Sequence, residues 1–286
     1  MNDAELRSLA ESLTVTALRA GLITLRYFKS EDNVATQKAD GSPVTLADQE
    51  AEVLILEDLA KLTPDIPVIA EEAVSRGEVP EVGSRFFLVD PLDGTREFTG
   101  GSGEFTVNIG LIENGEPIFG IVYAPALGDI YLSLGRNEAV TAKVADPAAA
   151  AEAGLSSLPL VAIRTRPPAQ DGLTVVASRS HGTSEGEAWL KSLPLPVTDR
   201  RNTGSSLKFC LVARGEADLY PRYGPTMEWD TAAGHAVVGA AGGVVTTVDG
   251  ALFRYGKTDA GYRNGGFIVY SSEALRGRLA PFTAAR

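Results

Sequence analysis

The sequence predicts an α+β protein. Apolar residues recur at helical spacing from Ala4 to about Phe28. Strand-like segments between residues 105 and 134 are joined by short Asn-Gly and Gly-Asp connections, which favours an antiparallel meander over a doubly wound parallel sheet. The chain has 286 residues, of which 44% are hydrophobic and 22% are charged. It can therefore bury a sizeable core, as one large domain or as two compact lobes.

Charge and composition exclude several kinds of partner and site. The formal net charge is -11 and no run of Lys or Arg occurs, which argues against a nucleic-acid-binding surface. A phosphorylated ligand would need local cations. Cys210 is the single cysteine, so an internal disulfide and a cysteine-based metal site are both excluded. Because the chain has only two histidines, any metal site must be built from oxygen ligands.

The N-terminus is acidic and polar and carries no apolar segment of a signal peptide. No run of 18 apolar residues follows, so no transmembrane segment is expected. We therefore expect a cytoplasmic protein. Weak attachment to the inner face of the cell membrane stays open, and so does the choice between a homodimer and a monomer.

The first helix, from Ala4 to about Phe28, should bury one stripe of apolar residues and be structural. A second helix is expected from Thr45 to about Leu62, opened by a capping box in which Asp48 is the third helical residue. Capping alone would account for Asp48. Residues 68–70 then predict a short buried strand that ends directly in Glu71 and Glu72. Paired glutamates are usually solvated, but less commonly so at the end of an apolar strand.

The central stretch is RFFLVDPLDGTREF, residues 85–98. An apolar strand from Phe86 to Val89 is expected to end in a turn that crowds Asp90, Asp93 and the hydroxyl of Thr95. Two carboxylates about 4 Å apart repel by roughly 4 kcal/mol at an effective dielectric near 20. The turn therefore needs a bound cation, a proton on one carboxylate or a wide separation of the two carboxylates. The alternative is an ordinary Asp-rich turn.

Strands are expected at residues 105–112, 118–125 and 129–134. The tract from 145 to 160 is poor in bulky residues and is interpreted as a loop or a connection between lobes. We place the boundary there, which gives an N-terminal α+β lobe of residues 1–150 and a C-terminal lobe of residues 151–286.

In the second half, a strand is expected at 173–181 and a helix near 185–193. A helix is expected at 204–215. Its start is a Gly-Ser-Ser turn whose free amides could receive a phosphate, and it contains Cys210 as a core residue. Asp230 is interpreted as the N-cap of a small-residue helix that ends at Gly242 and Gly243. His235 within this helix is expected to pack. Residues 244–253 and 266–270 complete the lobe as strands.

Three of these motifs together resemble the lithium-sensitive, magnesium-dependent phosphomonoesterases of the inositol monophosphatase superfamily, which includes fructose-1,6-bisphosphatase. They are the Glu pair at 71–72, DPLDGT at 90–95 and WDTAAGHAVVGAAGG at 229–243. A narrower resemblance is to the 3'(2'),5'-bisphosphate nucleotidases of CysQ type. It rests on GEFTVNIGLI, GIVYAPA, SRSH, GSSLKFCLVARGEADLYPRYGPT and WDTAAGHAV.

The resemblance implies a layered αβαβα sandwich of two lobes with the active site between them. It also implies two or three Mg²⁺ ions and inhibition by Li⁺. Mg²⁺ is a hard ion that prefers oxygen ligands, in agreement with the crowded carboxylates. The implied metal ligands are the side chains of Glu71, Asp90, Asp93 and Asp230 and the backbone carbonyl of Leu92.

The same resemblance implies that Asp48 and Thr95 are catalytic. The Asp48 carboxylate would accept a hydrogen bond from the Thr95 hydroxyl, so that Thr95 can accept one from the metal-activated water that attacks in line. Amides of Gly94, Thr95 and Arg96 at a helix start would face the transferred phosphoryl group. Glu72 and Lys38 are expected beside the metal ligands and not among them.

The implied reaction is hydrolysis of the 3'-phosphate of adenosine 3',5'-bisphosphate to AMP and phosphate, with 3'-phosphoadenosine 5'-phosphosulfate as a second substrate. The alternatives are an inositol monophosphatase, a fructose-1,6-bisphosphatase or, from another class, a non-catalytic metal-binding regulatory protein. Lys and Arg are the expected partners of a second phosphate. The implied substrate-binding residues are Gly94, Thr95, His181, Ser205, Lys208, Arg222 and Asp230.

Overall fold

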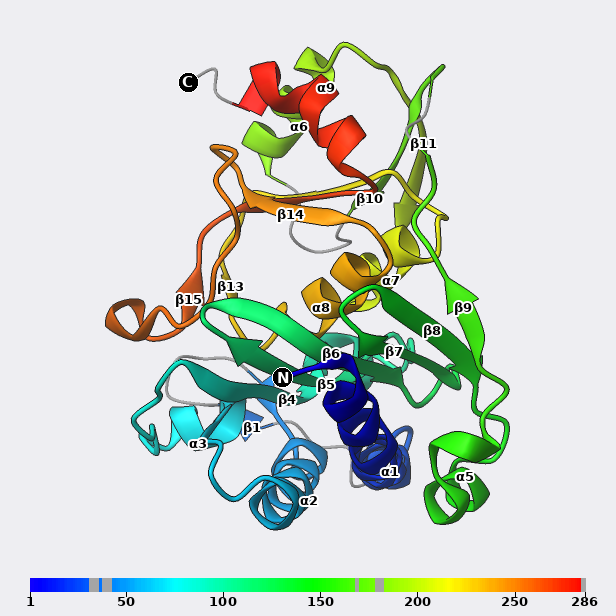
Figure 1. The fold of residues 1–286 in the computed structure, drawn as a ribbon, viewed down its shortest axis with the longest axis vertical. Coiled ribbons are helices and arrows are strands. Elements are labelled where there is room, and N and C mark those ends of the chain that lie inside the picture. The colour runs from blue at the N-terminus through cyan, green and yellow to red at the C-terminus, as the bar shows by residue number, and fades with distance from the viewer. Residues whose placement is uncertain (31–35, 38–42, 168–169, 178–182, 284–286) are drawn as a thin grey trace.

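Helical layers alternate with two sheets in this protein (Figure 1). The computed structural model describes residues 1–30, 36–37, 43–167, 170–177 and 183–283. Helices α1 (Asp3–Tyr27) and α2 (Leu46–Leu62) cover the outer face of a seven-stranded sheet, and α7 (Leu207–Ala213) and α8 (Ala232–Ala240) lie between it and a five-stranded sheet. Helices α6 (Ser184–Ser192) and α9 (Glu273–Thr283) cover the far side of that second sheet. The implied αβαβα sandwich is confirmed.

The remaining helices of the described chain are α3 (Glu71–Ser75), α4 (Thr95–Thr99) and α5 (Pro147–Ala153), with short 3₁₀ turns at Leu155–Ser157 and Thr258–Ala260. The strands of the seven-stranded sheet are β3 (Val68–Ala70), β4 (Arg85–Asp93), β5 (Thr106–Glu113), β6 (Glu116–Ala124), β7 (Asp129–Gly135), β8 (Glu138–Lys143) and β9 (Val161–Ile163). The five-stranded sheet contains β10 (Leu173–Ala177), β11 (Val197–Asn202), β12 (Leu219–Arg222), β14 (Val244–Thr247) and β16 (Phe267–Tyr270). Two small ladders pair β1 (Thr36–Gln37) with β2 (Pro43–Val44) and β13 (Thr226–Met227) with β15 (Arg263–Asn264).

The strands of the first sheet follow one another in chain order, from β3 to β9. The pairs from β4 to β9 are antiparallel, which confirms the predicted meander, whereas β3 and β4 run parallel. Because parallel strands end at the same edge of a sheet, the residues after β3 and near the end of β4 are brought together. Ala70 pairs with Val89 there, which sets Glu71 beside Asp90.

Strand β4 continues past the point where the sequence predicts a turn. Asp90 pairs with Asn108 and Asp93 pairs with Thr106, with an irregular register between them. The prediction that the strand ends at Val89 is therefore wrong. The irregularity accommodates Pro91, which cannot donate to the ladder, and lets the strand re-aim its carboxylates without losing its partner β5.

The tract at 145–160, interpreted as a loop, contains α5. Asp146 accepts hydrogen bonds from the amides of Ala148 and Ala149, and Pro147 is the first helical residue, so the start signals of a helix were present in the sequence. Beyond it, β9 pairs with β8 and extends the first sheet past residue 150. The lobe boundary stays a prediction.

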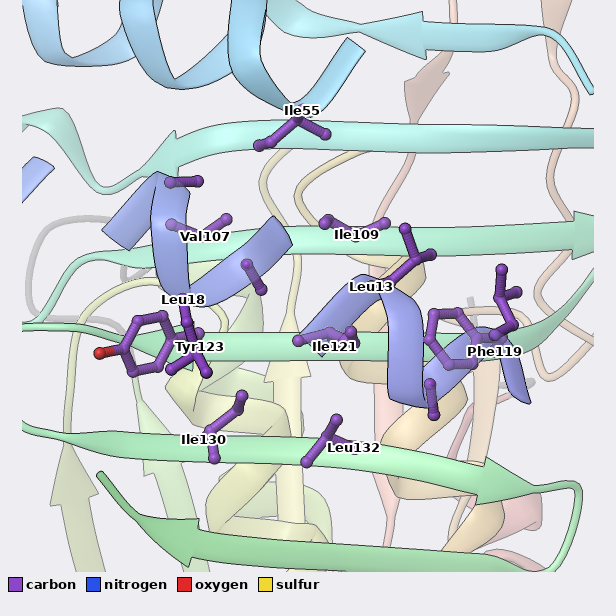
Figure 2. Close-up of a cluster of buried hydrophobic side chains, with 14 of the residues drawn as sticks. Leu13, Leu18, Ile55, Val107, Ile109, Phe119, Ile121, Tyr123, Ile130 and Leu132 are labelled. Carbon is purple, nitrogen blue, oxygen red and sulfur yellow. The ribbon is translucent and has the colours of Figure 1, made fainter. Parts of the chain in front are cut away.

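Helix α1 packs on the first sheet as its apolar stripe predicts. Figure 2 shows Leu13 and Leu18 over side chains of β5 and β6, among them Ile109 and Ile121. These side chains are fully buried, and α2 adds Ile55 to the same cluster. The outer helices and the first sheet thus form a rigid base from which the polar end of β4 projects.

Helix α8 packs on the other face of this sheet at unusually close range. A Cβ added to Gly120 would lie 2.3 Å from the carbonyl oxygen of Ala233, and one added to Gly110 would lie 2.8 Å from the Cβ of Ala232. Only glycine permits this approach. The N-cap of α8 is Thr231 and not Asp230, which corrects the predicted helix start. The Asp230 carboxylate is therefore available for the site.

Candidate active site

Three carboxylates from separate elements converge at the end of β4. Glu71 opens α3, Asp90 lies in β4, and Asp230 lies in the turn before α8. Each offers one oxygen, and these oxygens lie within 4.8 Å of one another. The parallel pairing of β3 with β4 supplies the first two, and the close packing of α8 supplies the third. The structure therefore brings these three predicted metal ligands together.

The electrostatics of this cluster call for a cation. Burial, followed by the neighbouring carboxylates of Glu71, Asp93 and Asp230, raises the pKa of Asp90 well above its usual 3.8. Burial and the carboxylates of Asp93 and Glu71 likewise raise the pKa of Asp230 well above 3.8. Grouped carboxylates resist ionising together, and a bound divalent cation removes that resistance. A set of oxygen donors fits Mg²⁺.

Leu92 and Asp93 lie next to the cluster. The buried Leu92 donates its amide to Asp90 Oδ1 at 3.0 Å and so orients that carboxylate. Asp93 Oδ2 accepts hydrogen bonds from Ser205 Oγ at 2.6 Å and from Ser206 Oγ at 3.2 Å. The backbone oxygen of Asp230, at 2.7 Å, is the nearer of the two acceptors for the single hydroxyl proton of Ser206. That Leu92 and Asp93 bind metal stays a prediction.

A cavity of about 440 Å³ opens in front of these carboxylates. Its lining comes from β4 of the first sheet, from α7 in the helical layer and from β12 of the second sheet. The predicted site residues that line it are Glu71, Asp90, Leu92, Asp93, Gly94, Thr95, Ser205, Lys208, Arg222 and Asp230. A pocket of this size with a few convergent polar groups is typical of a small-molecule site.

Asp48 occupies the capping box that the sequence predicts. Its Oδ2 accepts hydrogen bonds from the amide of Thr45 at 2.8 Å and from the Thr45 hydroxyl at 2.5 Å. Burial raises the pKa of Asp48 to about 7, with Glu72 and Glu71 adding to the rise and the bonds from Thr45 opposing it. A carboxyl group in this range can change its protonation state near neutral pH.

Thr95 begins α4, directly after Gly94 in a left-handed conformation at φ +93°. Ala47, the neighbour of Asp48, packs with Leu92 and Phe98, so the start of α2 lies against the segment that carries Thr95. Both residues are described, and no hydrogen bond joins their side chains. The pairing of Asp48 with Thr95 therefore stays a prediction.

Lys208 and Arg222 line the same cavity, together with a third cation, Arg96. Lys208 is 4% exposed and donates to the carbonyl oxygen of Ser205 at 2.6 Å, with a longer contact of 3.4 Å to that of Thr203. Burial lowers the pKa of Lys208 to about 8, with the Asp93 carboxylate opposing this shift and Arg222 adding to it. Arg222 donates to the carbonyl of Pro225 at 3.0 Å, and its buried Nε has no partner. Several cations around one cavity favour an anionic ligand.

Two predicted site residues, Lys38 and His181, lie outside the described residues. Glu72 is buried next to the cluster, and its amide donates to Glu52 Oε2 at 2.7 Å. The predicted packing roles of two other residues agree with the structure. Cys210 is buried in the core, and His235 packs beside a separate cavity of about 280 Å³, 3.1 Å from the hydroxyl of Tyr255.

Sequence reasoning missed Glu52 and Ser206. Burial raises the pKa of Glu52 to about 7, and its carboxylate holds the start of α3, where Glu71 and Glu72 stand. Its position four residues after Asp48, on the same face of α2, was the available signal. Ser206 bridges Asp93 and Asp230, but a second serine after a glycine gives no such indication in a sequence.

Among the described residues, none of the helices combines the length and apolar character needed to cross a membrane. Sequence and structure comparisons agree on one family. A model of the inositol monophosphatase family matches residues 5–282. The chain is 47% identical over 233 residues to the 3'(2'),5'-bisphosphate nucleotidase CysQ of Shigella flexneri, covering 81% of this chain and 87% of that protein. The Buchnera aphidicola protein of the same name is 37% identical over 92% of this chain and 94% of its own length.

Among solved structures, CysQ from Bacteroides thetaiotaomicron, a bacterial member of the inositol monophosphatase family, superposes with a TM-score of 0.72. It is 36% identical in sequence, and the match covers 92% of this chain and 97% of that one. An inositol monophosphatase from Zymomonas mobilis is 24% identical and shares the fold with a TM-score of 0.73. The chain belongs to the inositol monophosphatase family.

Proposed function

We propose that the protein is a Mg²⁺-dependent 3'(2'),5'-bisphosphate nucleotidase that hydrolyses the 3'-phosphate of adenosine 3',5'-bisphosphate to AMP and phosphate. One observation carries the proposal: the acidic cluster and the cations Lys208 and Arg222 line the same cavity. This suits a ligand with one phosphate at the metal site and another that needs cations of its own. The names of the relatives support the same activity. We expect 3'-phosphoadenosine 5'-phosphosulfate to be a second substrate.

The acidic wall would hold two or three Mg²⁺ ions. Glu71, Asp90 and Asp230 already converge, and Asp93 and the Leu92 carbonyl would complete the ligand set. When bound, Mg²⁺ would neutralise these carboxylates, activate water and stabilise charge on the transferred phosphoryl group. We expect Li⁺ to inhibit by competing for this set.

Asp48 and Thr95 would orient the attacking water. Thr45 holds Asp48 Oδ2 with two hydrogen bonds, which leaves Oδ1 to accept from the Thr95 hydroxyl. Thr95 would then accept a hydrogen bond from the water and direct its lone pair at phosphorus. Backbone amides of Gly94 and Thr95 would face the phosphoryl oxygens. Glu72 and Lys38 would support this arrangement from beside the ligands.

The 5'-phosphate would lie against Lys208 and Arg222. The partnerless Nε of Arg222 gives this wall a donor without an acceptor, a deficit that a phosphate oxygen would remove. Ser205, Asp230 and His181 would complete the contacts to the nucleotide. An inositol monophosphate carries no second phosphate to use these cations.

Phosphate release measured side by side on adenosine 3',5'-bisphosphate, inositol 1-phosphate and fructose 1,6-bisphosphate tests the proposal. We expect the first to have the highest kcat/KM, and no turnover in excess chelator. A preference for inositol 1-phosphate or fructose 1,6-bisphosphate would assign the protein to a sister activity instead. Mg²⁺ binding without turnover of any of the three would favour a non-catalytic regulatory protein.

A further inference from the structure

The turn that carries Asp230 is held from behind by a buried polar network that the proposed chemistry does not use. Glu228, fully buried, accepts hydrogen bonds from the amides of Gly256 and Lys257 at 2.8 and 3.0 Å. Lys257 Nζ lies 3.1 Å from Glu228 Oε1, so the charge of this carboxylate is balanced. The turn therefore begins at a residue that three polar contacts hold in place.

Asn264 connects this anchor to the rest of the turn. It is 1% exposed and lies in β15, paired with Thr226 of β13. Its Oδ1 accepts from Lys257 Nζ at 3.0 Å, and its Nδ2 donates to the carbonyl of Met227 at 3.1 Å and to Thr231 Oγ1 at 3.1 Å. The ammonium can only donate and the carbonyl can only accept, so these partners define which way the amide points.

Asn264 Nδ2 has a third, longer contact of 3.4 Å to Thr226 Oγ1. Its two nearer acceptors, Met227 and Thr231, flank Asp230 on both sides in the chain. Met227, whose carbonyl Asn264 holds, donates its amide to Asp230 Oδ2 at 2.9 Å. Thr231, whose hydroxyl Asn264 holds, follows Asp230 directly and is the N-cap of α8. Asn264 does not line the cavity in front of the carboxylates. Asn264 can therefore act on the site only indirectly, through the backbone that orients the Asp230 carboxylate.

We propose that Asn264 is a positioning residue for Asp230, holding its carboxylate in the orientation that meets Glu71 and Asp90. The inference rests on the proposed function in one respect, because it assumes that this cluster binds Mg²⁺. Partners that orient metal ligands contribute strongly to metal affinity, since a misdirected carboxylate must be reorganised at each binding event. A purely structural asparagine would affect folding stability and leave the affinity of the folded protein unchanged.

Two variants separate these roles. Asn264→Asp keeps the shape of the side chain and the acceptor for Lys257, but it replaces the donor to Met227 and Thr231 by an acceptor. Asn264→Ala removes all the contacts. The matched control is Leu13→Ala, which destabilises the protein by opening a cavity under α1, on the opposite face of the sheet from α8.

Mg²⁺ affinity is measured by titration calorimetry on folded protein at pH 8, and stability by urea unfolding in chelator. We expect both Asn264 variants to bind Mg²⁺ about 10- to 100-fold more weakly than wild type. Leu13→Ala should be less stable and bind Mg²⁺ as wild type does. For Asn264→Asp the direction of the change in Mg²⁺ affinity is informative, because an added negative charge by itself would tighten the binding of a cation.

Unchanged or tighter Mg²⁺ binding by folded Asn264→Asp would overturn the inference. If Asn264→Ala does not fold, Asn264→Asp decides alone, because it preserves volume and the Lys257 contact. If wild type itself bound no Mg²⁺, the proposed metal site would fall, and the inference with it. Failure of the inference and failure of the proposed function are thus distinguished by the wild-type titration.

Discussion

Ser205 Oγ donates a 2.6 Å hydrogen bond to Asp93 Oδ2, across 112 residues of chain. Asp93 ends β4 in the first sheet, and Ser205 stands two residues before α7 in the layer beneath the second. Ser205 has φ +53°, a left-handed conformation that non-glycine residues seldom adopt. Lys208 holds its carbonyl at 2.6 Å, so the strained residue is fixed from both its side chain and its backbone.

Substitutions at Ser205 should separate the hydrogen bond from the strain. Ser205→Ala loses the bond to Asp93 and keeps the strained conformation, whereas Ser205→Gly loses the bond and relieves the strain. We expect both to lower the free energy of unfolding, with Gly more stable than Ala by about 1 kcal/mol. Urea unfolding measures this. Equal stability of the two variants would show that the left-handed conformation carries no cost.

The buried carboxylates should be dispensable for folding and essential for activity. Asp90→Asn and Asp93→Asn are expected to abolish phosphate release while keeping the circular dichroism of wild type, because removing a charge weakens cation binding more than it harms packing. In chelator, Asp90→Asn should be at least as stable as wild type, since the pKa of Asp90 is raised by burial and neighbouring carboxylates. Full wild-type activity in excess chelator would reject the metal mechanism.

Loss of the water-orienting pair should act on turnover and not on binding. Thr95→Ala is expected to lower kcat by about 10²- to 10⁴-fold with little change in KM. Asp48→Asn should behave similarly and keep the helix start, because the amide oxygen of asparagine can still accept from Thr45. The double variant should fall no further than either single one. If the two effects multiplied, the residues would act independently and the pair would be wrong.

Arg222 offers the sharper test of substrate choice. Arg222→Ala should lower kcat/KM on adenosine 3',5'-bisphosphate by about 10- to 100-fold, the loss of a charge-assisted contact of about 1.5 to 3 kcal/mol. On inositol 1-phosphate the change should be small. Lys208→Ala should change the ratio of the two kcat/KM values in the same way. It should also lower the free energy of unfolding, because Lys208 donates a hydrogen bond to the Ser205 carbonyl. Equal losses of kcat/KM on both substrates would contradict the nucleotidase assignment.

Glu52 should make stability depend on pH near neutrality. Burial raises its pKa from 4.5 to about 7. Between these pH values the folded protein holds more protons than the unfolded chain, so this group lowers stability as pH rises from about 4.5 to 7, by at most about 1.4 kcal/mol per pH unit. Glu52→Gln has no titratable group at this position and so lacks this pH dependence of stability. In chelator, the variant should gain stability relative to wild type between pH 5 and pH 8 in urea unfolding, and a difference that is constant with pH would contradict the assignment.

Local chemistry let the sequence alone predict much of the framework. The helical stripe of α1, the Thr45 capping box and the meander from β4 to β7 depend on residues close in the chain, whose spacing and turn types are visible directly. Composition restricted a metal site to oxygen ligands. Motif resemblance then supplied the family and the ligand candidates, which spacing by itself does not define.

Only the tertiary structure decided which of these candidates meet. Glu71 joins Asp90 because β3 and β4 pair in parallel, and Asp230 joins them because Gly110 and Gly120 let α8 lie against the sheet. The extension of β4 through Asp93 depends on its pairing with β5. The roles of Glu52 and Asn264 likewise depend on partners in other elements. Strand register and interlayer packing bring together residues that can lie more than a hundred positions apart in the chain. Local periodicity carries no information about such contacts.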